Sequence, residues 1–507
     1  MLRDNAAVCA CRLETVSAWR AIARNVEVYL YGSHNDYWAP SPTLYENATK
    51  VTRAHEDGAT QVYSQISGFG GTIGSDLVHL RSWLTARLTW DPAADVDELV
   101  SDFCHGYYGP AGDAVLESIR LRHEAFAPGA AGDDASRSPV VAEFVDPPTA
   151  RRINELLEAA HDSLDEGAFR QHLGMAWIPY LWTDFWLGYE GVGGYDAATA
   201  TWAVPMADGE ARNRYGVLAK RFMVENGVNA LGERERIDPR ELGVEKMGVA
   251  WPAHRLRDGA MEVVIVPEVG GLIAELRDTE RDFAPLKACW GGLQLQYPLF
   301  SSTEDNVNGV QVTGYEAVLA GPDRVVMQCL RETGDIAKSV ALADGGLEVE
   351  LSVTARETTE LSAFSAVMLD LLDEGLGTHP TLSIHKTDGT WDSRVMGAET
   401  TFWWVDGEIS LDGTTGEIVL ASATRPEGVR LTVDPEQVSR LSFWYDRKMD
   451  YYPEPDQHGM LRLFLSGSKA HKPHAEPVSA APGESISLAY RLELLPDAGA
   501  VVSGAGR

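Results

Sequence analysis

The stretch that decides the organisation of this chain runs from Asp76 to Pro110 and reads DLVHLRSWLTARLTWDPAADVDELVSDFCHGYYGP. Residues 76–89 have the apolar spacing of an amphipathic helix. Asp91 is a favourable N-cap and Pro92 suits the first position of a helix, so we expect one helix to stop at Trp90 and the next to start at once. The second helix is predicted from four apolar residues at helical spacing: Val96, Leu99, Val100 and Phe103.

Length and charge limit the classes of protein to consider. A chain of 507 residues is too long for one hydrophobic core, so we expect two or three domains. The hydrophobic content of 44% is that of a folded protein, whereas the net charge is -32. Such an acidic surface repels phosphate backbones and anionic lipids. We therefore predict neither a nucleic-acid partner nor a membrane partner.

Targeting and metal signals are weak. No stretch approaches the roughly 20 apolar residues of a membrane-spanning helix, and Asp4 and Glu14 interrupt any signal-peptide core. We interpret the chain as cytoplasmic, or as a piece of a longer, secreted precursor. Five cysteines are present, and the Cys9-x-Cys11 pair lacks a second pair at zinc-site spacing. We therefore predict no metal and no cofactor.

The patterning of the chain changes twice along its length. Before residue 90, strand-like segments at 25–31 and 59–66 alternate with helical ones, which predicts βαβ units and a parallel sheet. Residues 91–240 have helical periodicity and predict a helical domain. Residues 245–497 contain short strands separated by turns, with hairpins expected at Asp344-Gly-Gly and Asp412-Gly, and residues 498–507 are predicted to be a disordered tail. The fold class is α/β plus α plus all-β.

The helical region contains an aromatic run, WIPYLWTDFWLGY, at residues 177–189. Aromatic side chains at near-helical spacing usually form a core. Their faces also suit the C–H faces of pyranose rings, so a sugar-stacking surface is the alternative. We favour the core.

Two segments resemble known families. The run from Leu80 to Pro92, followed by DVDEL at 95–99 and the GYYGP turn, resembles a junction in the DUF4838 family of α-glucuronidase-like bacterial glycoside hydrolase candidates. There a barrel passes into a helical domain, so the resemblance implies that residues 1–90 are the C-terminal part of a (β/α) TIM-type barrel. It also implies N-terminal truncation, because about eight strands and 250 residues make a barrel. The segment VIVPEVGGLI at 264–273 resembles the opening hairpin of a galactose-mutarotase-like β-supersandwich.

Polar and aromatic side chains follow the two predicted strands, where the active face of a parallel α/β fold lies. Asp36 is the one carboxylate there and is our candidate catalytic residue. Five side chains are our candidates for contacting a sugar: Tyr31, His34, Tyr37, Tyr63 and Gln65. The resemblance places acidic residues of the family where this chain has Leu30 and Ser64, so two of the family's acidic side chains are absent here.

Three functions follow from these observations. The first is hydrolysis of a glycosidic bond in an oligo- or polysaccharide by carboxylate acid–base chemistry, which usually needs two carboxyl groups and would be incomplete in this chain alone. The second is a non-catalytic glycan-binding or interaction module. The third is an aldose-epimerase-like activity in the β-domain, where His379 and His385 lie six residues apart and face the same side if the run is extended.

Overall fold

The computed structural model describes residues 16–31, 40, 43–66, 74–125, 146–186, 193–203, 209–229, 236–242, 250–287, 303–308, 310–370, 376–377, 379–396, 404–438, 440–446, 460–465 and 477–503. The chain forms two compact units. Unit 1 comprises Met1–Gly188, Glu210–Arg240 and Gly292–Gln296, and unit 2 comprises Tyr189–Gly209, Glu241–Gly291 and Tyr297–Arg507. The two units are described separately.

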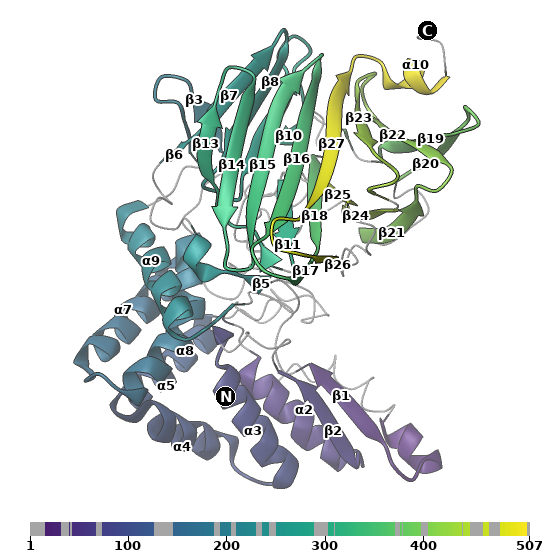
Figure 1. Ribbon diagram of the computed structural model, residues 1–507. Coiled ribbons are helices and arrows are strands. Elements are labelled where there is room, and N and C mark those ends of the chain that lie inside the picture. The colour runs from purple at the N-terminus through teal and green to yellow at the C-terminus, as the bar shows by residue number, and fades with distance from the viewer. Residues whose placement is uncertain are drawn as a thin grey trace. The chain divides into compact units, whose positions relative to one another are not determined.

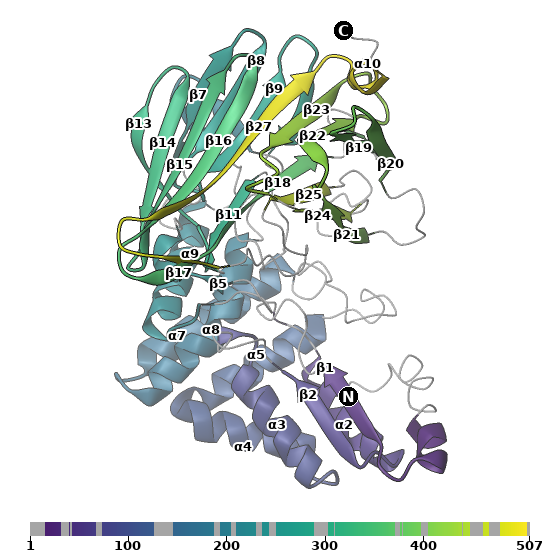
Figure 2. The same cartoon turned by 45° about the vertical axis from the view of Figure 1, so that its right-hand side comes forward.

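Unit 1 begins with two parallel strands. Strand β1 (Glu27–Tyr31) pairs with β2 (Gln61–Gln65), and helix α2 (Leu44–Glu56) connects them (Figure 2). This confirms the predicted strand–helix–strand unit. Helix α2 buries an apolar stripe that recurs at helical spacing, namely Leu44, Ala48, Val51 and Ala54. Within the described residues the sheet has these two strands and does not amount to a barrel.

The junction after residue 90 differs in detail from the prediction. Helix α3 (Val78–Trp90) ends where expected, but α4 (Val96–Tyr108) starts later than predicted. Asp91 is not the N-cap, because its carboxylate accepts a hydrogen bond from the backbone N–H of Ala93 in a short turn. Asp95 caps α4 instead by accepting from the N–H of Glu98 at 3.0 Å.

Helices complete unit 1. They are α5 (Gly112–Ala125), α7 (Pro147–Ser163), α8 (Ala168–Trp186) and α9 (Gly209–Glu225). The aromatic run lies on α8, and its large side chains Trp177, Tyr180, Trp182 and Phe185 are at most 1% exposed. The core interpretation of this run is therefore confirmed for these residues.

A buried charge cluster ties the helices of unit 1 together. The carboxylate of Asp76 accepts from Arg81 on α3 and from Arg122 on α5, each at 2.7 Å. Both guanidinium groups are almost fully buried. Arg122 also lies over the ring of Tyr180 on α8, at 6.0 Å from its centroid. One carboxylate thus links three helices through two cations.

Unit 2 is built on a long antiparallel sheet (Figure 1). Its strand order is β13 (Glu316–Ala320), β14 (Arg324–Leu330), β15 (Gly334–Ala343), β16 (Gly346–Ala355), β27 (Ser485–Leu495), β23 (Gly428–Val433), β22 (Thr414–Ala421), β19 (Thr381–Lys386) and β20 (Trp391–Val395). Burial alternates strictly along β15, as expected for a strand with one face in the core. Asp344 and Gly345 have positive φ angles and form the predicted β15–β16 hairpin turn.

A second sheet packs on the inner face of the first. The strands that unit 2 contributes to it are, in order, β21 (Trp404–Ser410), β24 (Arg440–Asp446), β25 (Met460–Leu465), β18 (Ala363–Asp370), β11 (Thr303–Val307) and β12 (Val310–Gln311). One hydrophobic cluster joins Ile336 and Val340 of β15 to Val367 and Leu369 of β18. The prediction of a hairpin at Asp412-Gly413 is wrong, because β21 and β22, which flank this turn, pair in different sheets.

Shorter strands complete unit 2. The strands β7 (His254–Asp258), β8 (Met261–Val266), β9 (Leu272–Asp278) and β10 (Phe283–Lys287) form a further antiparallel sheet. The Pro267-x-x-Gly-Gly turn joins β8 to β9, and Gly270 and Gly271 both adopt positive φ angles there. The described part of the chain thus combines helices with extensive antiparallel sheets in a sandwich-like arrangement.

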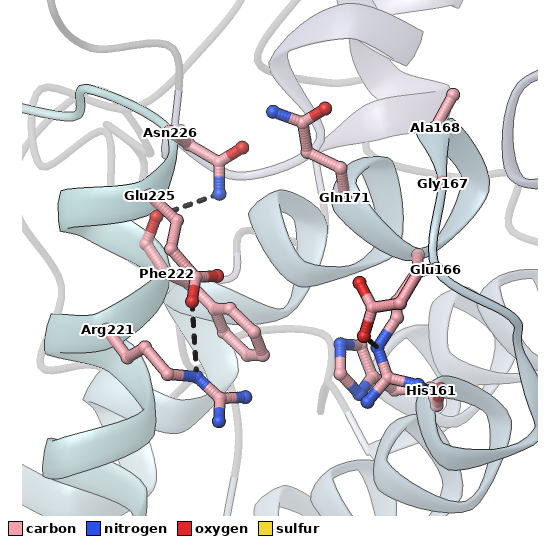
Figure 3. A pocket seen from close by; sticks show the side chains of 10 residues that line it. His161, Glu166, Gly167, Ala168, Gln171, Arg221, Phe222, Glu225 and Asn226 are labelled. Atoms are coloured by element: carbon pink, nitrogen blue, oxygen red, sulfur yellow. Dashed lines mark hydrogen bonds and ion pairs between the residues drawn. The ribbon is translucent and has the colours of Figure 1, made fainter.

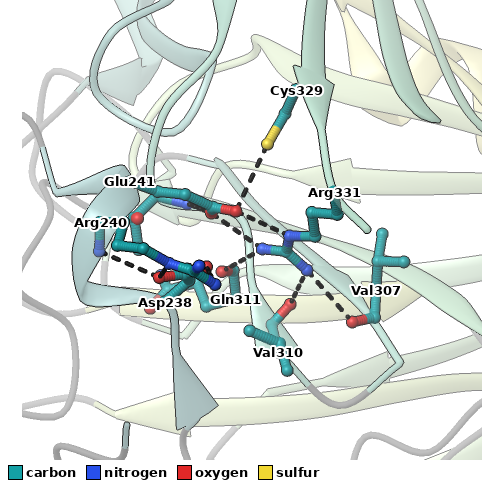
Figure 4. A network of polar contacts seen from close by, with 9 residues as sticks. Asp238, Arg240, Glu241, Val307, Val310, Gln311, Cys329 and Arg331 are labelled. Atoms are coloured by element: carbon teal, nitrogen blue, oxygen red, sulfur yellow. Dashed lines mark hydrogen bonds and ion pairs between the residues drawn. The ribbon is translucent and has the colours of Figure 1, made fainter. Parts of the chain in front are cut away.

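A largely buried ion pair anchors the start of unit 2 to its sandwich (Figure 4). The guanidinium of Arg331 donates to both carboxylate oxygens of Glu241, at 2.8 and 2.9 Å. It also donates to the carbonyl of Gln311 at 2.8 Å. Burial, together with the charge of Glu241, raises the pKa of the neighbouring Cys329 to about 12, so this thiol stays protonated. The arrangement is a structural clamp.

Residues 498–503 near the C-terminus are helical. Ala498–Ser503 form helix α10, so the expected disordered tail is not found over these residues. The physical reason is packing, because Ala498 is fully buried against Val419 and Leu495. None of the described helices combines the length and the apolar character needed to cross a membrane.

Replacing Asp76 should destabilise the protein strongly. In Asp76→Ala, Arg81 and Arg122 lose their shared counter-ion while remaining buried, which should lower the free energy of unfolding by about 3–5 kcal/mol. The measurement is urea denaturation followed by circular dichroism. The matched control is Arg120→Ala, which removes exposed ion pairs with Glu117 and Glu124 and should change stability little. Equal losses in the two variants would contradict the importance of the buried cluster.

Buried His123 should make stability depend on pH. Burial, followed by the positive charge of Arg122, lowers the pKa of His123 from 6.5 to about 3. The unfolded state therefore binds more protons between these values, and stability should fall as the pH drops through that window, by up to about 1.4 kcal/mol per pH unit. His123→Phe removes the titration, so its unfolding free energy should fall less steeply between pH 6.5 and 4. Parallel pH profiles for the two proteins would contradict this assignment.

Candidate functional site

The structure describes the predicted site in part. His34, Asp36 and Tyr37 lie outside the described residues. Tyr31 is the last residue of β1, and its side chain also lies outside the description. Tyr63 and Gln65 are described in full and lie on β2. The geometry of the site therefore starts from these two residues and their neighbours.

Tyr63 and Gln65 are brought together with a third residue, Tyr29. Tyr29 pairs in register with Tyr63, and their rings lie 4.9 Å apart between centroids, tilted by 30°. The hydroxyl of Tyr29 donates to the side-chain carbonyl of Gln65. The two tyrosines are 50% and 54% exposed. We call these three residues the tyrosine face.

The pleat of the strands explains this arrangement. Side chains two positions apart share a face of a strand, so Tyr63 and Gln65 lie on one face of β2. In the parallel register, Tyr29 lies opposite Tyr63, and Tyr31 lies opposite Gln65. Sequence reasoning missed Tyr29, although its position two residues before Tyr31 was a sufficient signal. The alternate residues Val28 and Val62 are less exposed than the tyrosines.

Chemically, the tyrosine face offers aromatic surface beside hydrogen-bonding groups. Phenol rings supply rigid apolar area, and their hydroxyls remain available to polar groups of a ligand. The Gln65 amide carries both donors and an acceptor. Such a combination suits a ring-shaped ligand with an apolar face and polar edges. Its three residues include no carboxylate and no imidazole.

A polar pocket of about 520 Å³ lies between α7, α8 and α9 (Figure 3). Arg221 pairs with Glu225 on one wall at 3.7 Å, and Arg170 pairs with Glu166 on the other at 3.6 Å. Phe222 also lines the pocket but is only 3% exposed, so it offers no ring face for stacking. This pocket can hold a small polar ligand. No local sequence pattern predicted it, because its residues come from three helices and from the loop between α7 and α8.

His161, at the edge of this pocket, is buried and therefore favours its neutral form. Burial is the main cause that lowers its pKa, and the positive charges of Arg170 and Arg221 lower it further. Its ring lies 5.2 Å from that of Phe222 and 5.8 Å from that of Trp177. His161 thus belongs to the packing of the helices more than to an exposed reactive surface.

The two histidines singled out in the β-region are not brought to one site. His379 precedes β19, has a positive φ angle of 65°, and its Nδ1 hydrogen-bonds the carbonyl of Met396 at 3.0 Å. His385 lies on β19, where its Nδ1 meets Glu417 at 3.1 Å and its ring stacks on Trp391 at 4.6 Å. The run is not extended at His379, so the two side chains have separate partners.

Among the described residues, the carboxyl groups whose pKa is shifted all have a lowered pKa. Hydrogen bonds from Arg120 hold down the pKa of Glu117, and those from Ala198 and Thr390 hold down the pKa values of Asp196 and Asp388 respectively. Asp278 and Glu493 also have lowered pKa values, because hydrogen bonds from arginines outweigh burial. A general acid for glycoside hydrolysis needs a raised pKa. None of these shifted groups is of that kind.

Comparison with known proteins supports the sequence resemblance. Residues 6–119 match the model of the family described as a domain of unknown function, DUF4838. This range includes both strands of the tyrosine face and the α3–α4 junction. No curated protein matches the chain.

About half of the chain is similar in fold to solved galactose-mutarotase-like structures. A galactose mutarotase related enzyme from Lactobacillus acidophilus is 10% identical, with a TM-score of 0.34, over 49% of this chain and 98% of its own. A galactose mutarotase-like protein from Lactobacillus casei is 12% identical, with a TM-score of 0.33, over 48% and 99%. An aldose epimerase homologue from C. elegans is 11% identical, with a TM-score of 0.32, over 48% and 98%.

Proposed function

We propose that this protein binds carbohydrate, with the tyrosine face as the contact surface for an oligo- or polysaccharide. The observation that carries the proposal is the exposed, in-register pair of Tyr29 and Tyr63 beside the Gln65 amide. Two large aromatic side chains about half exposed on adjacent strands are unusual unless a ligand or partner covers them. A pyranose ring fits this surface, since its C–H face packs on a phenol ring while its hydroxyls reach the amide.

The chain around the tyrosine face adds groups of the same chemistry. The sequence that follows β1 contains His34, Asp36 and Tyr37, which are polar or aromatic. Loops that leave the carboxyl ends of parallel strands are where α/β folds place ligand contacts. We therefore include His34, Tyr37 and Tyr31 in the proposed binding surface.

We also propose that β1 and β2 are neighbouring strands of a (β/α) barrel, within a domain spanning residues 1–90. Parallel sheets are normally covered on both faces. Here α2 packs against the pair on one side, whereas Tyr29 and Tyr63 on the other face remain exposed. In a barrel this second face lines the interior, and the residues at the carboxyl ends of the strands, such as Gln65, lie at the mouth where ligands bind. The proposed helical and β-supersandwich domains then span 91–240 and 245–497.

The binding proposal predicts a loss of affinity when the rings are removed. Tyr63→Ala and Tyr29→Ala should each weaken binding at least tenfold, equivalent to about 1.4 kcal/mol, because each deletes half of the stacked surface. Isothermal titration calorimetry with xylo-, cello-, galacto- and glucurono-oligosaccharides measures this.

Trp90→Ala is the matched control, because Trp90 is an exposed aromatic residue, 89% accessible, at the end of α3. It should leave affinity unchanged. Binding of none of the oligosaccharides by the unmodified protein, or binding that survives both tyrosine substitutions, would overturn the proposal.

Hydrolysis of a glycosidic bond is the second candidate function, and one observation favours it. In the sequence, Asp36 follows the last residue of β1 by five positions. The segments that follow the carboxyl ends of parallel strands are where a (β/α) barrel carries its catalytic carboxyl groups. In this reading the tyrosine face holds the sugar and Asp36 transfers the proton.

Asp36→Asn tests this second function directly. If Asp36 transfers the proton, turnover of 4-nitrophenyl glycosides and 4-nitrophenyl glucuronides should fall by about 10²-fold or more. Calorimetric affinity for the oligosaccharides should persist, because the tyrosine face is intact. Equal rates in the two proteins, or no turnover in either, would remove Asp36 from a catalytic role and leave binding as the function.

A further inference from the structure

A lysine and an aspartate meet in the core of unit 2. Lys338 lies on β15 and Asp305 on β11, so they belong to the two facing sheets of the sandwich. Both side chains are 0% exposed, and Nζ of Lys338 lies 2.6 Å from Oδ2 of Asp305. Because Cγ is bonded to Oδ2, the amine nitrogen is also in van der Waals contact with the carboxyl carbon.

The two oxygens of this carboxylate have different donors. Ser365 on β18 donates to Oδ1 at 2.9 Å, and the hydroxyl of Tyr315 donates to Oδ2 at 3.1 Å. The surroundings are built closely around these groups. A Cβ atom at Gly271 would come within 2.8 Å of the Tyr315 ring and 3.3 Å of the Lys338 stem, so glycine leaves room for both.

The ionised form of the pair is poorly satisfied. An ammonium group has three donors, yet within the described residues Asp305 is the one hydrogen-bond acceptor that Nζ contacts. Removing two charges from water costs several kcal/mol per ion, which good geometry only partly repays. A neutral amide has a single N–H and no charge, so it fits this apolar interior better than the ion pair does.

We propose that Lys338 and Asp305 condense into an intramolecular isopeptide bond that joins the two sheets of the sandwich. Contact between the reacting atoms in a fixed, water-poor site is the arrangement that accelerates such reactions. Each neighbour then has a role. Ser365 hydrogen-bonds Oδ1, the oxygen that stays in the amide, and Tyr315 hydrogen-bonds Oδ2, the oxygen that leaves as water.

The reaction balances without an oxidant or a co-reactant. A proton first passes from the ammonium to Oδ2 across their hydrogen bond, which gives a neutral amine and a neutral acid. The amine lone pair then forms the Nζ–Cγ bond while negative charge develops on Oδ1, where Ser365 donates. The Cγ–Oδ2 bond breaks as Tyr315 donates its proton to the departing hydroxyl, and the phenolate recovers a proton from Nζ. The products are the amide and one water.

The bond would act as a covalent staple. It closes a loop between positions 305 and 338 and links β11 to β15, which do not pair with each other. A cross-link of this kind stabilises a fold chiefly by restricting the unfolded chain, as a disulfide does. Unlike a disulfide, it is insensitive to reductants.

Mass spectrometry of the full-length protein tests the proposal. The intact mass should be lower than that of the sequence by one water, about 18 Da, as expected for a covalent condensation. After trypsin, the peptide 288–324 should be joined to 332–356 through Lys338, where cleavage is blocked. An unshifted mass and free 332–338 and 339–356 peptides would overturn the proposal and leave a plain ion pair.

Two substitutions test whether Lys338 and Tyr315 take part in forming the bond. Lys338→Met removes the nucleophile and should restore the full mass expected for its sequence. Tyr315→Phe keeps the ring and removes the proton donor, so the cross-linked fraction in freshly made protein should fall at least tenfold. A mass deficit that persists in Lys338→Met would place the modification elsewhere and overturn the assignment. Should Lys338→Met fail to fold, the peptide map of the unmodified protein still decides.

Discussion

The carboxylate of Asp76 is the interaction on which unit 1 depends. It lies between the strand β2 and helix α3 in the chain, and it binds Arg81 and Arg122 from two helices. Because both guanidinium groups are buried, neither finds a substitute in water. The turn that follows the tyrosine face is therefore tied to the helical core.

The local sequence pattern was sufficient to predict a helix or strand where one face of that element is buried. The parallel pairing of β1 and β2 and the hairpin at Asp344-Gly345 follow from the alternation of strand-like and helical segments and from turn chemistry. The start of α4 does not follow from the local pattern. Asp91 and Asp95 are both acceptable N-caps, and the tertiary fold decides which of them caps the helix. Asp412-Gly413 looks like a hairpin turn, yet it connects two sheets, and that depends on long-range pairing.

The residues of the candidate sites also divide into those that the local sequence pattern predicts and those that it does not. Tyr63 and Gln65 could be selected from their place at the end of a predicted strand, and Tyr29 follows from the same alternation. The polar pocket of unit 1 could not be predicted from the sequence. Glu166 lies far from Arg221 and Asn226 along the chain, and the three residues share no motif. The pair of Lys338 and Asp305 could be predicted only in part. It interrupts an alternating apolar row between Ile336 and Val340, and an inward-facing lysine could be recognised from that row, whereas its partner Asp305 could not.

The division of the chain between the two units has a consequence for biosynthesis. Unit 1 takes its helix α9 from residues that follow Tyr189–Gly209, a segment of unit 2. A ribosome therefore delivers part of the second unit before the first is complete, although domains usually fold in order as they emerge. The buried side chains of α8 must wait for Phe222 and Met223 of α9, both nearly inaccessible in the finished fold. Nascent chains arrested before residue 222 would consequently lack the ring of Phe222, which packs against Trp177 of the aromatic run in the finished fold.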